Sequence, residues 1–206
     1  MRKTLLALLA CAAMPGAVAV SAAAPPNSVT IALSRPAVVY GGTVKLSGVV
    51  SNHQAGEKVT ILAEAFGESN FSDITSVDTV AGGKWSYVAK PTIRTSYEAK
   101  WKGAISKAVT VNVRPLISLE LVSLASRTFS TTATGARSFQ GKFVLVQRVT
   151  STGVLNIKKV TLDASSTATF HVRLHRGRNR LRVVMPSSQT APGYITGYSK
   201  VLTVRR

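Results

Sequence analysis

The chain has 206 residues with 26 Lys and Arg against 8 Asp and Glu, which gives a formal net charge of +18 at pH 7. This length allows one domain or two. The only cysteine is Cys11, so everything after it is excluded from thiol catalysis, thiolate metal ligation and disulfide formation.

Residues 1–23 have the pattern of a secretory signal peptide. A basic start leads into a short Leu-rich run that ends in small residues, as such peptides do. We predict cleavage near Ala23, a short spacer over 24–28, and a secreted or cell-surface location. Because Pro15-Gly16 breaks the apolar run, we expect no transmembrane segment after cleavage. A lipidated Cys11 is the less favoured alternative, since the apolar run before it is short.

From Val29 onward, short segments alternate apolar and polar residues. In the first half such segments begin at Val29, Val44, Val59, Val77, Trp85, Tyr97 and Val109. Period-two alternation predicts half-buried strands. Turn residues separate the segments, Pro36 interrupts the first one, and an irregular region is expected over 66–73. The pattern predicts an all-β chain.

The second half repeats this pattern. In Lys90–Trp101 and again in Leu174–Met185, a turn leads into a strictly alternating run. Gly56, Val59, Ile61 and Trp85 match Gly141, Val144, Val146 and Phe170 at one constant offset. No Gly/Ser-rich linker separates the copies, so we expect a restricted orientation between them. The second copy carries an insertion, Pro186–Tyr194, which we expect to be a loop.

The segment from Gly82 to Tyr87, followed by Pro91 and Thr95–Trp101, resembles strands of bacterial immunoglobulin-like repeats of exported and cell-surface proteins. The resemblance implies a β-sandwich and a spacer or adhesive role, with no chemistry. It also implies that the hydroxyl of Tyr97 bonds to backbone beside the turn. The second copy departs from the family by having Leu181 at that position.

The predicted fold class is therefore all-β, with two tandem immunoglobulin-like β-sandwich domains after the signal peptide. We place the first domain at 29–115 and the second, strongly basic domain at 116–206. Trp85, Phe170 and Trp101 fall in the inward register and are expected in the cores.

Groups able to perform catalysis or bind metal are few. His171 and His175 have a spacing that suits zinc on a helix, but in a strand they would lie about 13 Å apart. No acidic loop resembles a calcium site, and no Gly-rich stretch resembles a phosphate loop. We predict a non-catalytic protein without cofactor or metal.

The positive charge is concentrated in the second half. Residues 28–115 hold ten Lys/Arg against six Asp/Glu, a net of +4, whereas 116–206 hold fourteen against two, a net of +12. The densest run is His171–Arg182. If Val172, Leu174, Leu181 and Val183 point inward, the outer face holds His171, Arg173, Arg180 and Arg182, and the turn between the strands holds Arg176 and Arg178. Antiparallel pairing would set these arginines side by side.

This face predicts binding of an anionic cell-envelope polymer or polysaccharide. The candidate residues are Arg173, Arg176, Arg178, Arg180 and Arg182. The alternative to binding is a merely solvated cationic face. Nucleic acid is disfavoured as a partner, because the run has no aromatic residues on which bases could stack.

A second candidate surface is the loop 186–198, through which a carbohydrate or protein partner could bind. Tyr194 and Tyr198 could stack on a sugar or fill a protein pocket. Alternatively, Tyr198 starts the last strand and Tyr194 anchors the loop. The predicted function is that of an exported structural or binding protein of the cell envelope or extracellular space.

Overall fold

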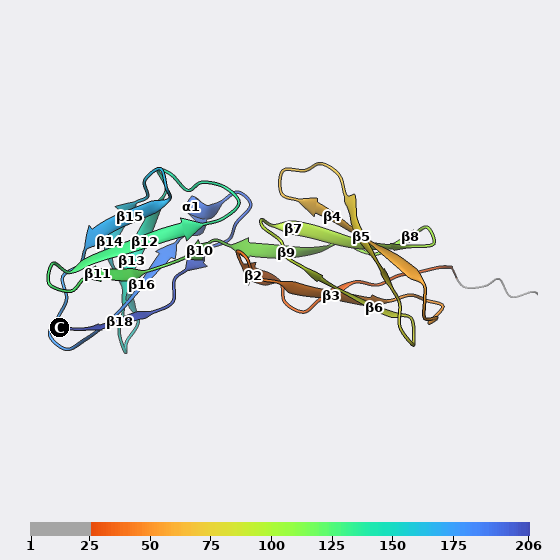
Figure 1. The fold of residues 1–206 in the computed structure, drawn as a ribbon, viewed down its shortest axis with the longest axis horizontal. Helices are drawn as coiled ribbons and strands as arrows, with labels where there is room; N and C mark the ends of the chain where they lie inside the picture. The colour runs from red at the N-terminus through yellow and green to blue at the C-terminus, as the bar shows by residue number, and fades with distance from the viewer. Residues whose placement is uncertain (1–25) are drawn as a thin grey trace, which may run out of the picture.

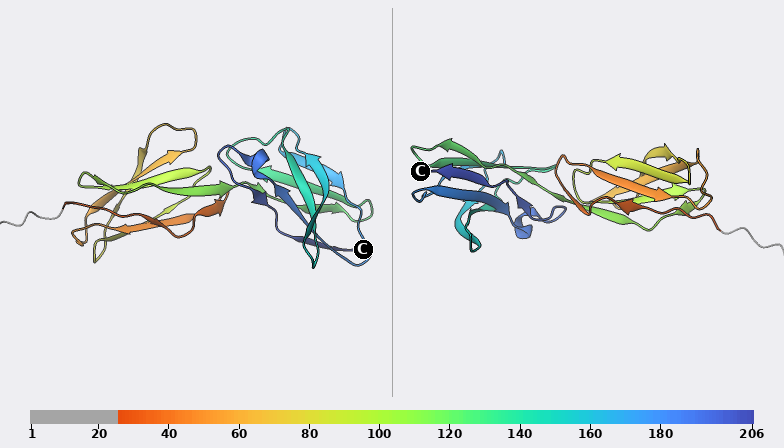
Figure 2. Two further views of the ribbon diagram at one scale, coloured as in Figure 1. Left: turned by 180° about the vertical axis from the view of Figure 1, so that it is seen from behind. Right: turned by 90° about the horizontal axis from the view of Figure 1, so that it is seen from below.

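The computed structural model describes residues 26–206, so the predicted signal peptide and the start of the spacer lie outside the described residues. The regular secondary structure of the described chain is β-strand throughout, apart from one short helix, α1 (Ser187–Thr190). Its strands form two groups that lie end to end (Figures 1 and 2). Over residues 26–206, no helix is long and apolar enough to cross a membrane.

The described part of the N-terminal half, from residue 26 on, contains nine strands in two sheets. They are β1 (Ala32–Leu33), β2 (Ala37–Val39), β3 (Val44–Val49), β4 (Lys58–Ala65), β5 (Ser72–Asp78), β6 (Lys84–Ala89), β7 (Thr95–Trp101), β8 (Ala104–Ile105) and β9 (Val109–Arg114). One sheet has the order β1-β3-β6, and the other has the order β2-β9-β7-β4-β5 with β8 beside β7. Pro36 separates β1, which pairs with β3, from β2, which runs parallel to β9. The chain therefore changes sheets at this proline.

The C-terminal half is built in a similar way. Its strands are β10 (Leu116–Ile117), β11 (Glu120–Ser123), β12 (Thr128–Thr134), β13 (Phe143–Val149), β14 (Val154–Thr161), β15 (Thr167–His171), β16 (Arg178–Met185), β17 (Gly197–Tyr198) and β18 (Leu202–Arg205). One sheet joins β10, β12, β11 and β15, and the other joins β14, β13, β16, β17 and β18. Only Pro115 separates β9 from β10, so the two halves follow each other without a linker.

Buried side chains from both sheets of each half form the core. The alternating runs place Tyr97, Ala99 and Trp101 inward on β7, and Leu181, Val183 and Met185 inward on β16. Trp85 and Phe170 are also buried. The predicted all-β class and the predicted inward register of these runs are confirmed.

Two local predictions are correct only in part. The region 66–73 is irregular as expected as far as residue 71, but strand β5 begins at Ser72, because its backbone pairs with β4 from that residue on. The insertion expected to be a loop begins with the helical turn α1, in which the amides of Gln189 and Thr190 donate to the carbonyl of Pro186.

The hydroxyl of Tyr97 does not make the hydrogen bond to backbone that the family resemblance implies. Among the described residues it makes no hydrogen bond to backbone, whereas the neighbouring Thr95 hydroxyl donates to the carbonyl of Ile93 at 2.8 Å. Burial raises the pKa of Tyr97 to about 12, and the Thr95 side chain opposes this rise. Tyr97 therefore acts mainly as a core aromatic residue.

Candidate anion-binding face and junction loop

Strand β16 separates its side chains by face. Asn179, Leu181, Val183 and Met185 are buried, while Arg178 and Arg180 are exposed and Arg182 is half-buried on the opposite side. This division follows from the period of two in a strand. Arg180 and Arg182 thus lie on the predicted outer face of β16. Arg178, which was expected in the turn, is instead the first residue of the strand and joins this face, because its backbone pairs with Arg205.

Arg173 does not join this row, so the predicted pairing of the arginine-bearing strands is wrong. Strand β15 pairs with β12 in one sheet, whereas β16 lies between β13 and β18 in the other. The segment 172–177 crosses from one sheet to the other. The outward residues opposite Arg182 and Arg180 are Gln147 and Thr203, which are uncharged.

Carboxylates do not neutralise the cations of the C-terminal half. Over residues 26–206 the one ion pair is Lys102–Glu57, at 2.7 Å in the N-terminal half. The Lys102 ammonium, Trp101 and Asn52 lower the pKa of Glu57 by hydrogen bonding, against a smaller opposing effect of burial. The fourteen Lys and Arg of the C-terminal half thus have no carboxylate within 4.0 Å in the described chain.

The predicted arginines differ in how far the protein already engages them. Arg182 donates from Nε to Gln147 Oε1 at 2.8 Å, and its guanidinium lies 5.2 Å from the ring centre of Tyr198. The other four make no side-chain hydrogen bond to any described residue: Arg173, Arg176, Arg178 and Arg180. Their donors are available to a ligand.

The turn that carries Arg176 is held in place by buried Asn179. The Asn179 amide accepts from the backbone N–H of His175 at 2.9 Å and donates to the carbonyls of His175 and Gly177 at 2.8 and 3.1 Å. Gly177 and Arg206 also exchange two backbone hydrogen bonds. The turn is therefore ordered before any ligand arrives, which lowers the entropy lost on binding.

Sequence reasoning missed Arg148 on β13. Its guanidinium donates to Nε2 of His175 and to the carbonyl of Arg173, the latter at 2.6 Å. It thereby links β13 to the crossing segment and adds a positive charge beside the candidate arginines. Nothing in the sequence connects Arg148 with residues 173–180, because the contact depends on strand pairing.

Tyr194 is not available to a ligand, which corrects one of the two tyrosine assignments. Its side chain is only 4% exposed. Its hydroxyl accepts from the backbone N–H of Ala136 at 2.6 Å and donates to the carbonyl of Thr92, in the N-terminal half, at 2.7 Å. The ring packs edge-on against Phe139, and burial raises the pKa of Tyr194. Tyr194 anchors the loop, as the alternative interpretation expected.

The rest of this loop also contacts the N-terminal half. Arg94 N–H donates to the carbonyl of Gly193 at 2.9 Å, and Ile195 N–H donates to the carbonyl of Val113 at 3.0 Å. A Cβ added to Gly193 would lie 2.7 Å from Cδ1 of Ile93. The insertion of the second copy therefore forms a contact between the two halves.

Tyr198 remains at the surface, with 47% of its area exposed, at the end of β17. The guanidinium of Arg114, from the last strand of the N-terminal half, lies 5.8 Å from its ring centre and also donates to the carbonyl of Thr196. Arg182 lies over the same ring. The structure thus brings an aromatic residue next to the arginine row, which the sequence run alone lacked.

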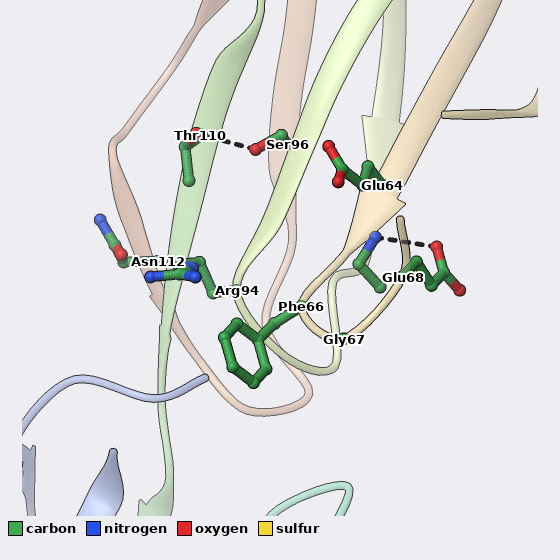
Figure 3. Close-up of a pocket in the computed structure, with 9 residues that line it drawn as sticks. Glu64, Phe66, Gly67, Glu68, Arg94, Ser96, Thr110 and Asn112 are labelled. Carbon is green, nitrogen blue, oxygen red and sulfur yellow. Dashed lines mark hydrogen bonds between the residues drawn. The ribbon is translucent and has the colours of Figure 1, made fainter. Parts of the chain in front are cut away.

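Figure 3 shows a hollow of about 550 Å³ on the outer face of β4, β7 and β9 in the N-terminal half. Several of its polar groups engage one another or stack. Glu68 accepts from Ala65 N–H at 3.0 Å, Ser96 and Thr110 share a hydrogen bond of 3.0 Å, and Arg94 lies over Phe66. We assign no ligand to this hollow.

Metal-ligating side chains do not gather anywhere in the described chain: no group of three or more His, Cys, Asp or Glu could hold an ion there. His171 lies at the end of β15, where its Nδ1 is near Thr128 Oγ1 and the carbonyl of Ser126, both at 3.1 Å.

The chain matches no protein-family model and no curated protein. Among solved structures it is similar to one described as "Crystal structure of tetra-tandem repeat in extending region of large adhesion protein". The identity is 13%, the TM-score is 0.35, and the match covers 87% of this chain and 49% of that one. The chain thus spans about half the length of that protein, and a likeness at this level supports no assignment of function.

Proposed function

We propose that this chain is a non-catalytic, exported binding and spacer protein made of two tandem immunoglobulin-like β-sandwich domains, 29–115 and 116–206. The second domain binds an anionic polymer of the cell envelope or extracellular space. Separate sheets in the two halves support the domain division. The junction loop supports a spacer role, because it ties the halves together through direct hydrogen bonds.

The observation that carries the binding proposal is the unneutralised charge of the C-terminal half. Fourteen cations and two carboxylates form no ion pair there within residues 26–206. Exposed like charges repel one another and are stabilised by an anion that lies between them. A polymer with many anionic groups can contact several such cations at once, so weak single contacts add up.

Binding at two salt concentrations tests this function. The mature chain should bind an anionic polymer at about 50 mM salt and lose most of that binding at about 300 mM, because salt screens exposed charges. The variant with Arg173, Arg178, Arg180 and Arg182 changed to Gln should bind weakly at both concentrations.

The matched control changes four exposed lysines of the N-terminal half to Gln: Lys45, Lys84, Lys90 and Lys107. It removes the same charge from the other half and should keep most of the binding. Equal loss in the two variants would contradict a binding face in the C-terminal half, and absence of binding by the unchanged chain would contradict the function.

Tyr198 supports a second candidate function, carbohydrate binding at the same face. Its exposed ring could stack on a sugar, although two guanidinium groups already lie against it. Stacking changes little with salt. Salt-resistant binding to a neutral polysaccharide that Tyr198→Ala abolishes would favour this alternative.

A further inference from the structure

Two hollows lie beside the segment 172–177, which crosses between the two sheets of the C-terminal half. Arg148 and His175 line both of them. The smaller, of about 160 Å³, is completed by Ile157, Lys158, His171, Val172 and Arg173. The larger, of about 460 Å³, also contains Leu155, Arg178, Asn179 and Arg180. Neither hollow has a carboxylate in its wall.

Arg148 contributes a partly buried charge that the protein leaves uncompensated. Two of its nitrogens donate to His175 and to the carbonyl of Arg173, which are neutral acceptors. Its Nε is fully buried and has no hydrogen-bond partner within residues 26–206. A guanidinium removed from water without an opposite charge is unfavourable. A bound anion close to it would remove that penalty.

Arg178 and Arg180 stand on the same face of β16 at the larger hollow, and both guanidinium groups are exposed. On the neighbouring strand β18, Thr203 lies across from Arg180 and Arg205 lies across from Arg178. Arg205 therefore adds a further cation at this edge. Asn179, between the two arginines, holds the adjoining turn through its three hydrogen bonds. The hollow is therefore a concave surface beside an ordered turn, with two exposed arginines in its wall.

The chemistry of the hollow selects among anions. Each guanidinium presents several N–H donors in a planar fork. Two such groups offer more donors than one carboxylate can accept. A sulfate ester or a phosphate monoester has three unesterified oxygens, and a phosphodiester has two bridging oxygens besides its two unesterified ones. The wall also includes apolar Leu155, which is 58% exposed. A volume of about 460 Å³ lies in the range of sites for small organic ligands, so it accommodates more than a bare ion.

We propose that this larger hollow binds an ester oxyanion, phosphate or sulfate, of a polyol or sugar polymer. Arg178 and Arg180 contact the anion, and the Leu155 side contacts the carbon skeleton. This inference rests on the proposed function and locates it at one site.

The test compares two double variants of the full chain that lose the same charge. Arg178→Gln with Arg180→Gln removes the proposed contacts. Lys142→Gln with Lys200→Gln removes two exposed cations of the C-terminal half that line neither hollow. Binding is measured at about 100 mM salt to a glycerol phosphate polymer, to dextran sulfate and to neutral dextran. Thermal unfolding verifies that each variant folds.

The arginine variant should lose at least about 10-fold in affinity for the preferred polymer, since each charged hydrogen bond contributes roughly that factor. The lysine variant should lose less than about 3-fold, because its charges act only through screened solvent. The polymer bound more tightly identifies phosphate or sulfate as the source of the anion. Equal losses in the two variants would overturn the hollow as the site while leaving charge-driven binding intact. Failure of the unchanged chain to bind either anionic polymer would overturn the proposed function as well.

Discussion

Gly193 offers a direct probe of the contact between the two halves, because a second glycine provides a control with the same backbone angle. Gly193 and Gly177 both have φ of +88°. A Cβ at Gly193 would lie 2.7 and 2.9 Å from two atoms of Ile93, whereas a Cβ at Gly177 would meet nothing within 4 Å. Alanine at either site incurs the cost of a left-handed backbone, about 1–2 kcal/mol.

Gly193→Ala adds a steric cost that Gly177→Ala does not have. Forcing a methyl group into a packed contact costs typically about 1–3 kcal/mol. The two variants are compared as full chains by thermal unfolding. A difference of about 2 kcal/mol in the free energy of unfolding corresponds to roughly 4–8 °C for a chain of about this length that unfolds as one unit. Gly193→Ala should therefore melt several degrees below Gly177→Ala. Equal melting temperatures would refute the close packing of the loop on the N-terminal half.

Three further predictions concern titratable side chains. Tyr194→Phe should destabilise the chain by about 1–3 kcal/mol in urea unfolding, because the N–H of Ala136 and the carbonyl of Thr92 lose their partner. The hydroxyl of Tyr198 has no partner among the described residues, so Tyr198→Phe should change the free energy of unfolding by less than about 0.5 kcal/mol. Because the pKa of Tyr97 is raised from 10.0 to about 12 in the folded chain, the free energy of unfolding should fall by up to about 2–3 kcal/mol as pH rises from about 10 toward 12. Tyr97→Phe should remove this loss in an alkaline unfolding series. An identical pH profile for the variant and the unchanged chain would contradict the raised pKa. Glu57→Gln should lower the melting temperature at neutral pH, because the stabilisation by Lys102 requires the ionised carboxyl. At pH below the lowered pKa of Glu57 the variant and the unchanged chain should melt alike. A lower melting temperature of the variant that persists in acid would show that packing, not charge, is responsible.

The face on which each residue lies was predictable from the sequence, because strand alternation is a local property. Tyr97 and Leu181 were expected inward and are buried, and Arg180 was expected outward and is exposed. Alternation does not identify the partner of a strand, however. The arginine-bearing segments were expected to pair, but 172–177 crosses between sheets, so Arg173 lies apart from the row on β16.

The remaining features of the site depend on contacts between distant residues. Arg148 reaches His175 only because β13 pairs with β16. Tyr194 bonds to Thr92 only because the insertion folds back onto the other half. Such long-range contacts have no local signature in a single sequence. The charge of the second half, by contrast, is a sum over its residues, so it follows from composition alone.

Backbone amide chemical shifts of the full chain, followed during titration with the preferred anionic polymer, test the binding proposal most directly. The account predicts that the largest changes occur at residues 148–155 and 173–182, and that they disappear at about 300 mM salt. Changes centred instead on the hollow between Glu64 and Asn112 in the N-terminal half, or spread evenly over every lysine and arginine, would contradict it.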